Sequence, residues 1–182
     1  MNIVTTVSGL ELKDEDMVKL DMHLIPPNVS TANDWKSMIR EMKTHRDMLE
    51  KKATFFRQDT GQYIRPIVLI QVERTGRDQR GRGFVHSQDV REYLIEQNIN
   101  TDEIAIKSSL QNDIEDINLF SSNCSIRWII TRDALREGWD CSFAYMLGII
   151  PNVNSNTGIT QLVGRILRQP NAKKTGVTEL DE

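Results

Sequence analysis

The clearest indication of the fold is the run Ile67-Val68-Leu69-Ile70-Gln71-Val72, which follows Arg65-Pro66. It has the length of a strand and is apolar except for one glutamine. A continuous apolar run suits a parallel strand, because helices cover both faces of a parallel sheet and leave no exposed side. The run therefore predicts a parallel strand, buried on both faces, in an α/β domain.

Strand and helix patterns alternate along the rest of the chain, after a polar loop at 73–83. Alternation of this kind builds βαβ units, a parallel sheet and right-handed crossovers. Sites in such sheets form at the carboxyl ends of the strands. Strands are expected at 103–107, 126–131 and 143–150, and helices after a Ser87 cap, after a cap at Ser108 or Ser109, at 133–137 and at 159–168.

Residues 1–61 are expected to form an N-terminal extension that packs on, or leads into, the domain at 62–182. Its apolar and β-prone stretches predict short strands at 2–7 and 18–25. A long helix is expected from about 33 to 56, since the apolar residues there recur at close to the 3.6-residue helical period.

Composition describes an ordinary folded domain. The 182 residues are 38% hydrophobic and 27% charged, with a net charge of −3. A domain that binds nucleic acid by itself is usually basic. Contact with nucleic acid is therefore expected only from local positive patches or from a neighbouring domain.

Cysteine and histidine usage predicts no metal site. Cys124 and Cys141 lie far apart, and the three histidines are scattered, whereas metal sites need clustered ligands. We expect both thiols to be reduced, as in the cytosol. No apolar run approaches the ~20 residues that span a bilayer, and no signal peptide is evident. A cytoplasmic location is expected.

The segment Gln161-Leu162-Val163-Gly164-Arg165-Ile166-Leu167-Arg168 predicts a helix with one polar face. At ~100° per residue, Gln161, Arg165 and Arg168 fall within an arc of ~60°. Gly164 lies beside them and costs ~1 kcal/mol relative to alanine, which makes sense where another surface approaches closely. From the residues alone, a plain amphipathic helix with a solvated face is an equally good interpretation.

Three segments together resemble the second RecA-like domain of superfamily-two helicases. Residues 161–168 resemble motif six, residues 131–140 resemble motif five, and residues 66–72 are placed like the motif-four strand. The strings at 63–73, 134–141 and 161–170 are most similar to the restriction subunit of type III restriction-modification enzymes. The resemblance implies a RecA-like sheet whose domain is cut short near Glu182, within a longer polypeptide.

The resemblance also implies roles for individual residues. Arg168 would be the arginine finger and Arg165 a second γ-phosphate contact, with charges that suit a phosphoryl-transfer transition state. Gln161 would lie near the γ-phosphate or its water. Gly138 would allow a tight turn and Asp140 would contact the ribose or hold an arginine, with Gly164 close by.

A phosphate loop of the form G-x-x-x-x-G-K-[ST] is missing from the sequence. ATP and Mg²⁺ would therefore be bound mainly by a first RecA-like domain, and the chain alone is not expected to hydrolyse ATP. The implied partners are double-stranded DNA, that first domain and a methyltransferase subunit, with no membrane. DNA cleavage would belong to a nuclease domain beyond residue 182.

Nucleic-acid contacts are expected where strands end. Thr131 would place its hydroxyl or amide on a phosphate, by the same resemblance. Lys107, Ser108 and Ser109 follow a strand and are expected to open a helix, which makes a natural phosphate cradle. A plain N-cap serine is the alternative. The arginine-rich loop at 74–82 is either a DNA-backbone contact or a solvated loop.

Two other functions stay open. The chain could be a non-catalytic docking module whose Arg165 and Arg168 are solvated. It could also come from another superfamily-two DNA or RNA helicase, because related bacterial proteins share such strings.

Overall fold

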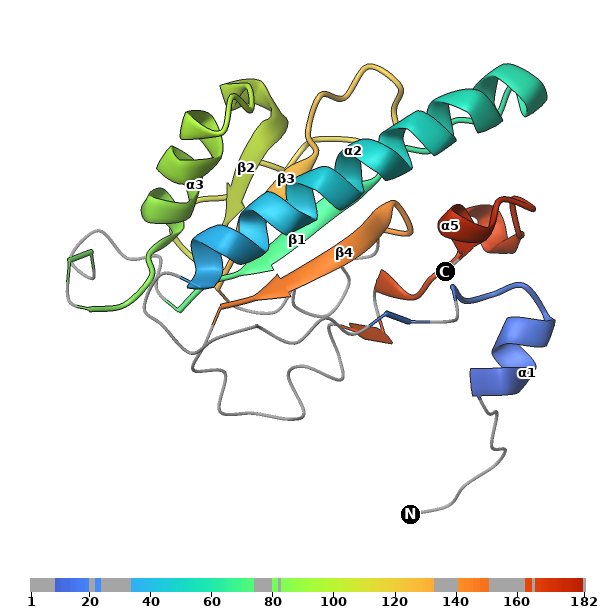
Figure 1. Cartoon of the computed structure of the whole chain (residues 1–182), viewed down its shortest axis with the longest axis horizontal. Helices are drawn as coiled ribbons and strands as arrows, with labels where there is room; N and C mark the ends of the chain where they lie inside the picture. The colour runs from blue at the N-terminus through green and yellow to red at the C-terminus, as the bar shows by residue number, and fades with distance from the viewer. Residues whose placement is uncertain are drawn as a thin grey trace, which may run out of the picture.

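The computed structural model describes residues 9–19, 22–23, 34–73, 80–81, 83–132, 141–150, 163–164 and 166–181. Figure 1 shows the elements in space. In chain order they are α1 (Gly9–Asp14), α2 (Asp34–Thr60), β1 (Ile67–Gln71), α3 (Ser87–Glu96), η2 (Thr101–Glu103), β2 (Ile104–Lys107), β3 (Trp128–Thr131), β4 (Ala144–Ile149), η3 (Pro170–Ala172) and α5 (Thr178–Asp181).

The four strands form one parallel sheet in the order β2-β3-β1-β4. The predicted parallel α/β sheet is thus confirmed, with β1 inside it as its apolar run indicates. All five residues of β1 are buried. The strands expected at 103–107, 126–131 and 143–150 appear as β2, β3 and β4.

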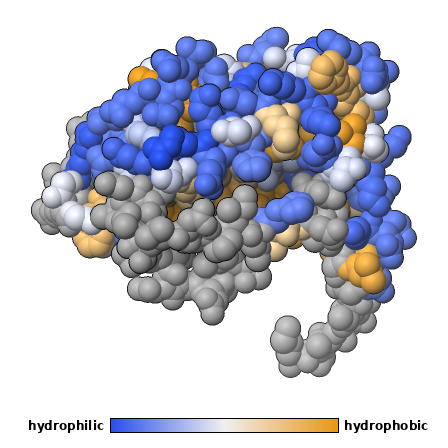
Figure 2. All heavy atoms as spheres, viewed as in Figure 1, coloured by the Kyte–Doolittle hydropathy of each residue, from blue (hydrophilic) through white to orange (hydrophobic). Residues whose placement is uncertain are grey.

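One face of the sheet, here called the helix face, is covered by α2 and α3. Val68, Ile70 and Ile130 point to this side, and they pack in one core cluster with Ile39 of α2 and Val90 of α3. In Figure 1, α2 lies along the sheet and its C-terminal end projects beyond it. Over this part of the molecule the visible surface is largely hydrophilic (Figure 2), as expected for the outer side of a long surface helix.

Helix α2 packs closely on β4 at Gly148. A Cβ atom added there would lie 2.7 Å from Sδ of Met42, closer than real contacts allow. The helix that precedes β1 is therefore part of the sheet's own core. Its C-terminal half reaches the core of the opposite face through Leu49, Ala53 and Phe56.

The opposite face, here called the loop face, is covered by the β2–β3 connection at 108–127 and by the C-terminal segment. Leu69 and Ile129 pack there with Leu119 and Leu180. The helix expected after Ser108 is wrong, since these connecting residues form turns and loop. The carboxylate of Asp113 accepts a hydrogen bond of 2.9 Å from the backbone N–H of Ile106, in the outermost strand β2. Side-chain bonds of this kind to the backbone compete with helix formation.

Arg65 fastens the 108–127 connection to the sheet. It is fully buried, and its guanidinium donates to the carbonyl oxygens of Ser121 at 2.9 Å, of Cys124 at 2.6 Å and of Leu119. It also donates to the hydroxyl of Tyr63 at 3.0 Å. These bonds give a loop without regular structure a fixed path.

Several local expectations need correction. The N-cap of α3 is His86, not Ser87: its ring accepts the Gln88 N–H while Asp89 accepts the His86 N–H. Helix α1 was not expected. Of the strand expected at 18–25, the described residues 18, 19, 22 and 23 show a single bridge, at Val18.

Two expected elements, the strand at 2–7 and the helical turn at 133–137, lie outside the described residues. Among the helices that the structure describes, none combines the length and apolar character needed to cross a bilayer.

Candidate functional site

The carboxyl edge of the sheet carries a row of three polar residues. Lys107 ends β2, Thr131 ends β3 and Gln71 ends β1, and the register pairs Lys107 with Thr131 and Thr131 with Gln71. Side chains alternate along a strand, so these three point to the same side as Leu69 and Ile129. We call Lys107, Thr131 and Gln71 the edge row.

Thr131 occupies the centre of this row and is 1% exposed. Its carbonyl oxygen accepts the N–H of Val72 at 2.8 Å, which extends the β1–β3 pairing by one bond. The next residue, Arg132, is exposed. The chain that leaves β3 therefore reaches the surface directly after Thr131. Thr131 itself is buried, so its hydroxyl does not face solvent.

Gln71 was not predicted as a site residue. Its Nε2 donates to the carbonyl oxygen of Arg132 at 3.2 Å, which links the end of β1 to the chain that leaves β3. Its Oε1 is buried and has no hydrogen-bond partner within the described part of the chain. An unpaired buried acceptor costs about 1–3 kcal/mol, so it marks a place for a donor. The signal was its position as the one polar residue in the 67–72 run.

Lys107 and the two serines do not form the expected cradle. Nζ of Lys107 donates to Oδ1 of Asn112 at 3.0 Å. Oγ of Ser108 accepts the N–H groups of Leu110 at 3.2 Å and Gln111 at 3.1 Å, so it uses donors that a phosphate would need. Ser109 is exposed. Because no helix begins here, the predicted helix-terminus site for a phosphate is wrong, and Lys107 remains as a cation.

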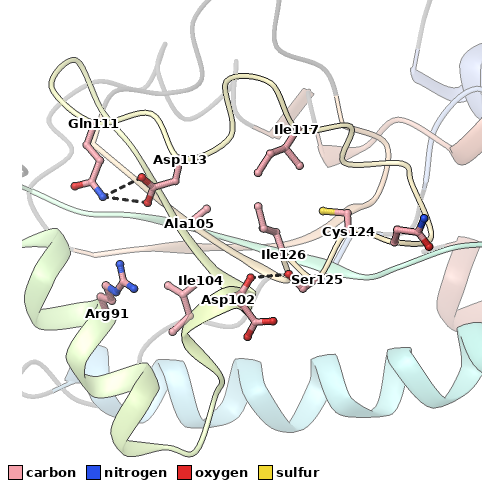
Figure 3. A pocket seen from close by; sticks show the side chains of 11 residues that line it. Arg91, Asp102, Ile104, Ala105, Gln111, Asp113, Ile117, Cys124, Ser125 and Ile126 are labelled. Atoms are coloured by element: carbon pink, nitrogen blue, oxygen red, sulfur yellow. Dashed lines mark hydrogen bonds between the residues drawn. The ribbon is translucent and has the colours of Figure 1, made fainter.

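A polar groove of about 540 Å³ opens between α3, β2 and the 108–127 connection (Figure 3). Nε2 of Gln111 donates to both carboxylate oxygens of Asp113, at 3.1 and 3.0 Å. Arg91 and Asp102 contribute charges of opposite sign to its lining. The groove lies at the outer edge of β2, away from the β3–β1 centre of the edge row.

The segment at 163–169 departs from the predicted continuous helix. Val163, Gly164 and Ile166 are helical, but the helix ends at Leu167 and Arg168 forms an antiparallel bridge with Val18. The expectation that the helix runs through Arg168 is therefore wrong, and the shared face of Gln161, Arg165 and Arg168 stays a prediction. Gln161 and Arg165 lie outside the described residues. No atom lies within 4 Å of a Cβ added at Gly164, so no described group makes the predicted close approach.

The bridge has a clear cause. The N–H of Lys19 donates to the carbonyl of Leu167 at 2.5 Å, and the N–H of Gln169 donates to that of Met17 at 3.0 Å. These bonds take the place of the helical bonds that would continue past Arg168. The side chain of Arg168 is exposed.

The bridge also determines which end of the sheet the Arg168 backbone adjoins. Nζ of Lys19 donates to the carbonyl of Ala144, at the start of β4, and Ala144 pairs with Ile67, the first residue of β1. Thr131 lies at the other, carboxyl, end of the strands. The structure thus brings Lys107, Thr131 and Gln71 together and ties the Arg168 backbone to a different end of the sheet. Gly138 and Asp140 lie outside the described residues.

Neither cysteine indicates a metal site. Among the described residues, no group of three or more His, Cys, Asp or Glu side chains could hold a metal ion. Cys124 and Cys141 are free thiols, and burial raises the pKa of Cys141 to about 11. Any Mg²⁺ would thus need ligands from another domain, from a bound nucleotide or from residues outside the described part.

Comparison of the chain with protein-family profiles, with curated proteins and with solved structures finds no match in any of the three.

Proposed function

We propose that the chain is the second RecA-like domain of a superfamily-two translocase that acts on double-stranded DNA, of the kind found in type III restriction subunits. The observation that carries the proposal is the edge row of Lys107, Thr131 and Gln71, because parallel α/β sheets place their ligand sites at this edge. The four-stranded parallel sheet is compatible with a RecA-like domain.

DNA would be held at this edge through its phosphates, which position the duplex without reading its sequence. Lys107 supplies a positive charge at one end of the row. Gln71 fixes the carbonyl of Arg132 and so the path of the chain that follows Thr131. With a net charge of −3, the whole chain attracts DNA weakly, so binding depends on such local groups.

ATP and Mg²⁺ would be held mainly by a first RecA-like domain, from the same polypeptide. Gln161, Arg165 and Arg168 would complete that site, with Gly138, Asp140 and Gly164 shaping its wall. An arginine that stabilises the charge of phosphoryl transfer is worth ~10³–10⁵ in rate. To serve the site, Arg168 must meet the nucleotide from its place beside Val18.

One observation favours a second candidate, a non-catalytic docking module. The backbone bonds of Leu167 and Gln169 attach the Arg168 segment to the N-terminal segment, and Lys19 attaches that segment to the start of β4 rather than to the edge row. An arginine held in this way, as Arg168 is, is suited to contacts with a protein partner as well as with a nucleotide.

ATP hydrolysis by the gene product that carries this chain separates the two candidates. We expect DNA-stimulated hydrolysis that Arg168→Ala reduces by about 10³-fold or more, while ATP binding stays within a few fold. Arg57→Ala, which removes an exposed arginine at the end of α2, is the matched control. Unchanged turnover in the Arg168 variant would instead favour the docking module. Stimulation by RNA rather than duplex DNA would indicate a different superfamily-two helicase.

A further inference from the structure

The N-terminal and C-terminal segments of the described chain are interlocked. Val18 and Arg168 face each other in an antiparallel bridge, with one backbone hydrogen bond on each side of the pair. We call Met17–Lys19 the N-terminal strap. Three residues with two backbone bonds do not form a stable ribbon by themselves, so something else must hold the strap in place.

Lys19 supplies that anchor. Its side chain is 2% exposed, and Nζ donates to the carbonyl oxygens of Ser142 at 3.0 Å and Ala144 at 2.7 Å. Ala144 is the first residue of β4, and Ser142 lies in the turn just before it. Nζ also lies 4.0 Å from the centroid of the Tyr145 ring, which attracts a cation. A lysine buried this deeply is rare, and here its amine has two carbonyl acceptors and an aromatic ring as partners.

Two further contacts surround the strap. Nζ of Lys174 lies 2.8 Å from Oδ1 of Asp16, an ion pair on the surface. On the other side, Nε2 of Gln169 donates to Oδ1 of Asp181 at 2.7 Å, in the last helix. Residues 167–169 are thus hydrogen-bonded to the strap on one side and to α5 on the other, and Lys19 bonds the strap to the sheet.

We propose that Lys19 is a positioning residue for Arg168, and that it acts by anchoring the N-terminal strap against β4. The inference rests on the proposed function for the role of Arg168 toward a nucleotide, but not for the strap itself. Fixing 167–169 in one conformation removes backbone freedom that a phosphate ligand would otherwise have to restrict.

Hydrogen–deuterium exchange of Lys19→Met tests the strap. Methionine keeps the length and apolar body of lysine but cannot donate to Ser142 and Ala144. We expect the amides of Lys19 and Gln169 to exchange about tenfold or more faster, while β1 and β3 keep wild-type protection. Lys43→Met, which removes a surface lysine of α2, is the matched control and should leave both amides unchanged. Unchanged exchange at Gln169, or an equal rise throughout the sheet, overturns the proposal.

ATP hydrolysis by the same variants in the gene product that carries this chain separates the strap from the proposed function. If Arg168 stabilises the transferred phosphate, Arg168→Ala and Lys19→Met both lower turnover, and only Lys19→Met changes exchange at Gln169. If exchange changes but neither variant alters turnover, the strap stands and the nucleotide role of Arg168 fails.

Lys174→Gln covers the case in which Lys19→Met does not fold. This variant loses an exposed ion pair with Asp16 and a long hydrogen bond to the carbonyl of Lys13 at 3.4 Å, so folding is not at risk. We expect about a twofold to fivefold rise in exchange at Gln169, with the sheet unchanged. No rise at Gln169 in this folded variant counts against the strap.

Discussion

Nζ of Lys19 lies 4.0 Å from the centre of the Tyr145 ring, inside the protein and beside the start of β4. Burial lowers the pKa of Lys19 from 10.5 to about 7, and the nearby thiol of Cys141 opposes that shift. The amine is therefore close to half protonated at neutral pH, although an exposed lysine would be fully charged.

This pKa predicts a pH dependence of stability. Between pH 7 and 10.5 the unfolded chain binds more protons at Lys19 than the folded chain, so the free energy of unfolding rises with pH, by at most about 1.4 kcal/mol per unit. Cys141 acts oppositely: burial raises its pKa from 9.0 to about 11, so its contribution is lost as pH increases above 9. Burial also raises the pKa of Tyr145, with a loss at still higher pH.

Between pH 7 and 9, of these three groups only Lys19 therefore changes the free energy of unfolding. Urea unfolding at pH 7, 8 and 9 should show rising stability in the wild type and a flatter profile in Lys19→Met. Parallel profiles for the two proteins would mean that Lys19 is not the titrating group.

Removing the Arg65 guanidinium should destabilise the fold strongly. Arg65→Met leaves the carbonyl oxygens of Leu119, Ser121 and Cys124 without their described donor, and we expect a loss of about 3–5 kcal/mol. Lysine should not restore it, because one ammonium cannot reproduce the planar fork. Tyr63→Phe removes a single acceptor and should cost about 1 kcal/mol. Denaturant unfolding measures both changes. Similar losses of unfolding free energy for the Arg65 and Tyr63 variants would show that the bonds from Arg65 to the 108–127 connection contribute little.

Enlarging Gly148 should strain the contact between β4 and α2. Gly148→Ala places a methyl group 2.7 Å from Sδ of Met42 and should cost about 1 kcal/mol, because the flexible methionine side chain can shift, with a larger loss for valine. Gly176→Ala is not a suitable control because that glycine has a positive φ angle. Combining Gly148→Ala with Met42→Val should recover part of the loss. Strictly additive effects in the double variant would argue against direct contact.

Salt dependence of DNA binding tests Lys107. If this lysine neutralises one phosphate, Lys107→Ala lowers the slope of log K against log salt by about 0.9. Lys51→Ala, an exposed lysine on α2, should leave the slope unchanged. Fluorescence anisotropy with a labelled duplex gives both values. Equal slopes for the wild type and Lys107→Ala would remove Lys107 from the DNA contact.

The sequence predicted the sheet well because its signals are local. A buried parallel strand must be apolar on both faces, and 67–72 could hardly form anything else. The long helix before it follows from its period, and α2 spans Asp34–Thr60. Lys107 and Thr131 could be named as edge residues because each ends such a strand.

Local patterns failed where distant or side-chain bonds decide the structure. Leu110, Ile114 and Ile117 have helical spacing, yet Ile114 is buried under the sheet while Leu110 is 78% exposed. Ser108 and Asp113 bond to nearby backbone and prevent the helix. The helix stops before Arg168 because Arg168 pairs with Val18, a residue near the other end of the chain, which no local periodicity reveals.

The bridge between Val18 and Arg168 has a consequence for how the chain is made. Its two halves lie 150 positions apart, so on a ribosome the strap must wait on the order of 10–30 s for its partner to be synthesised. For most of that interval Lys19 has neither Ser142 nor Ala144 to bind, because these residues follow it by 123 and 125 positions. The last strand of the sheet and the first residues of the chain therefore settle together, late in biogenesis.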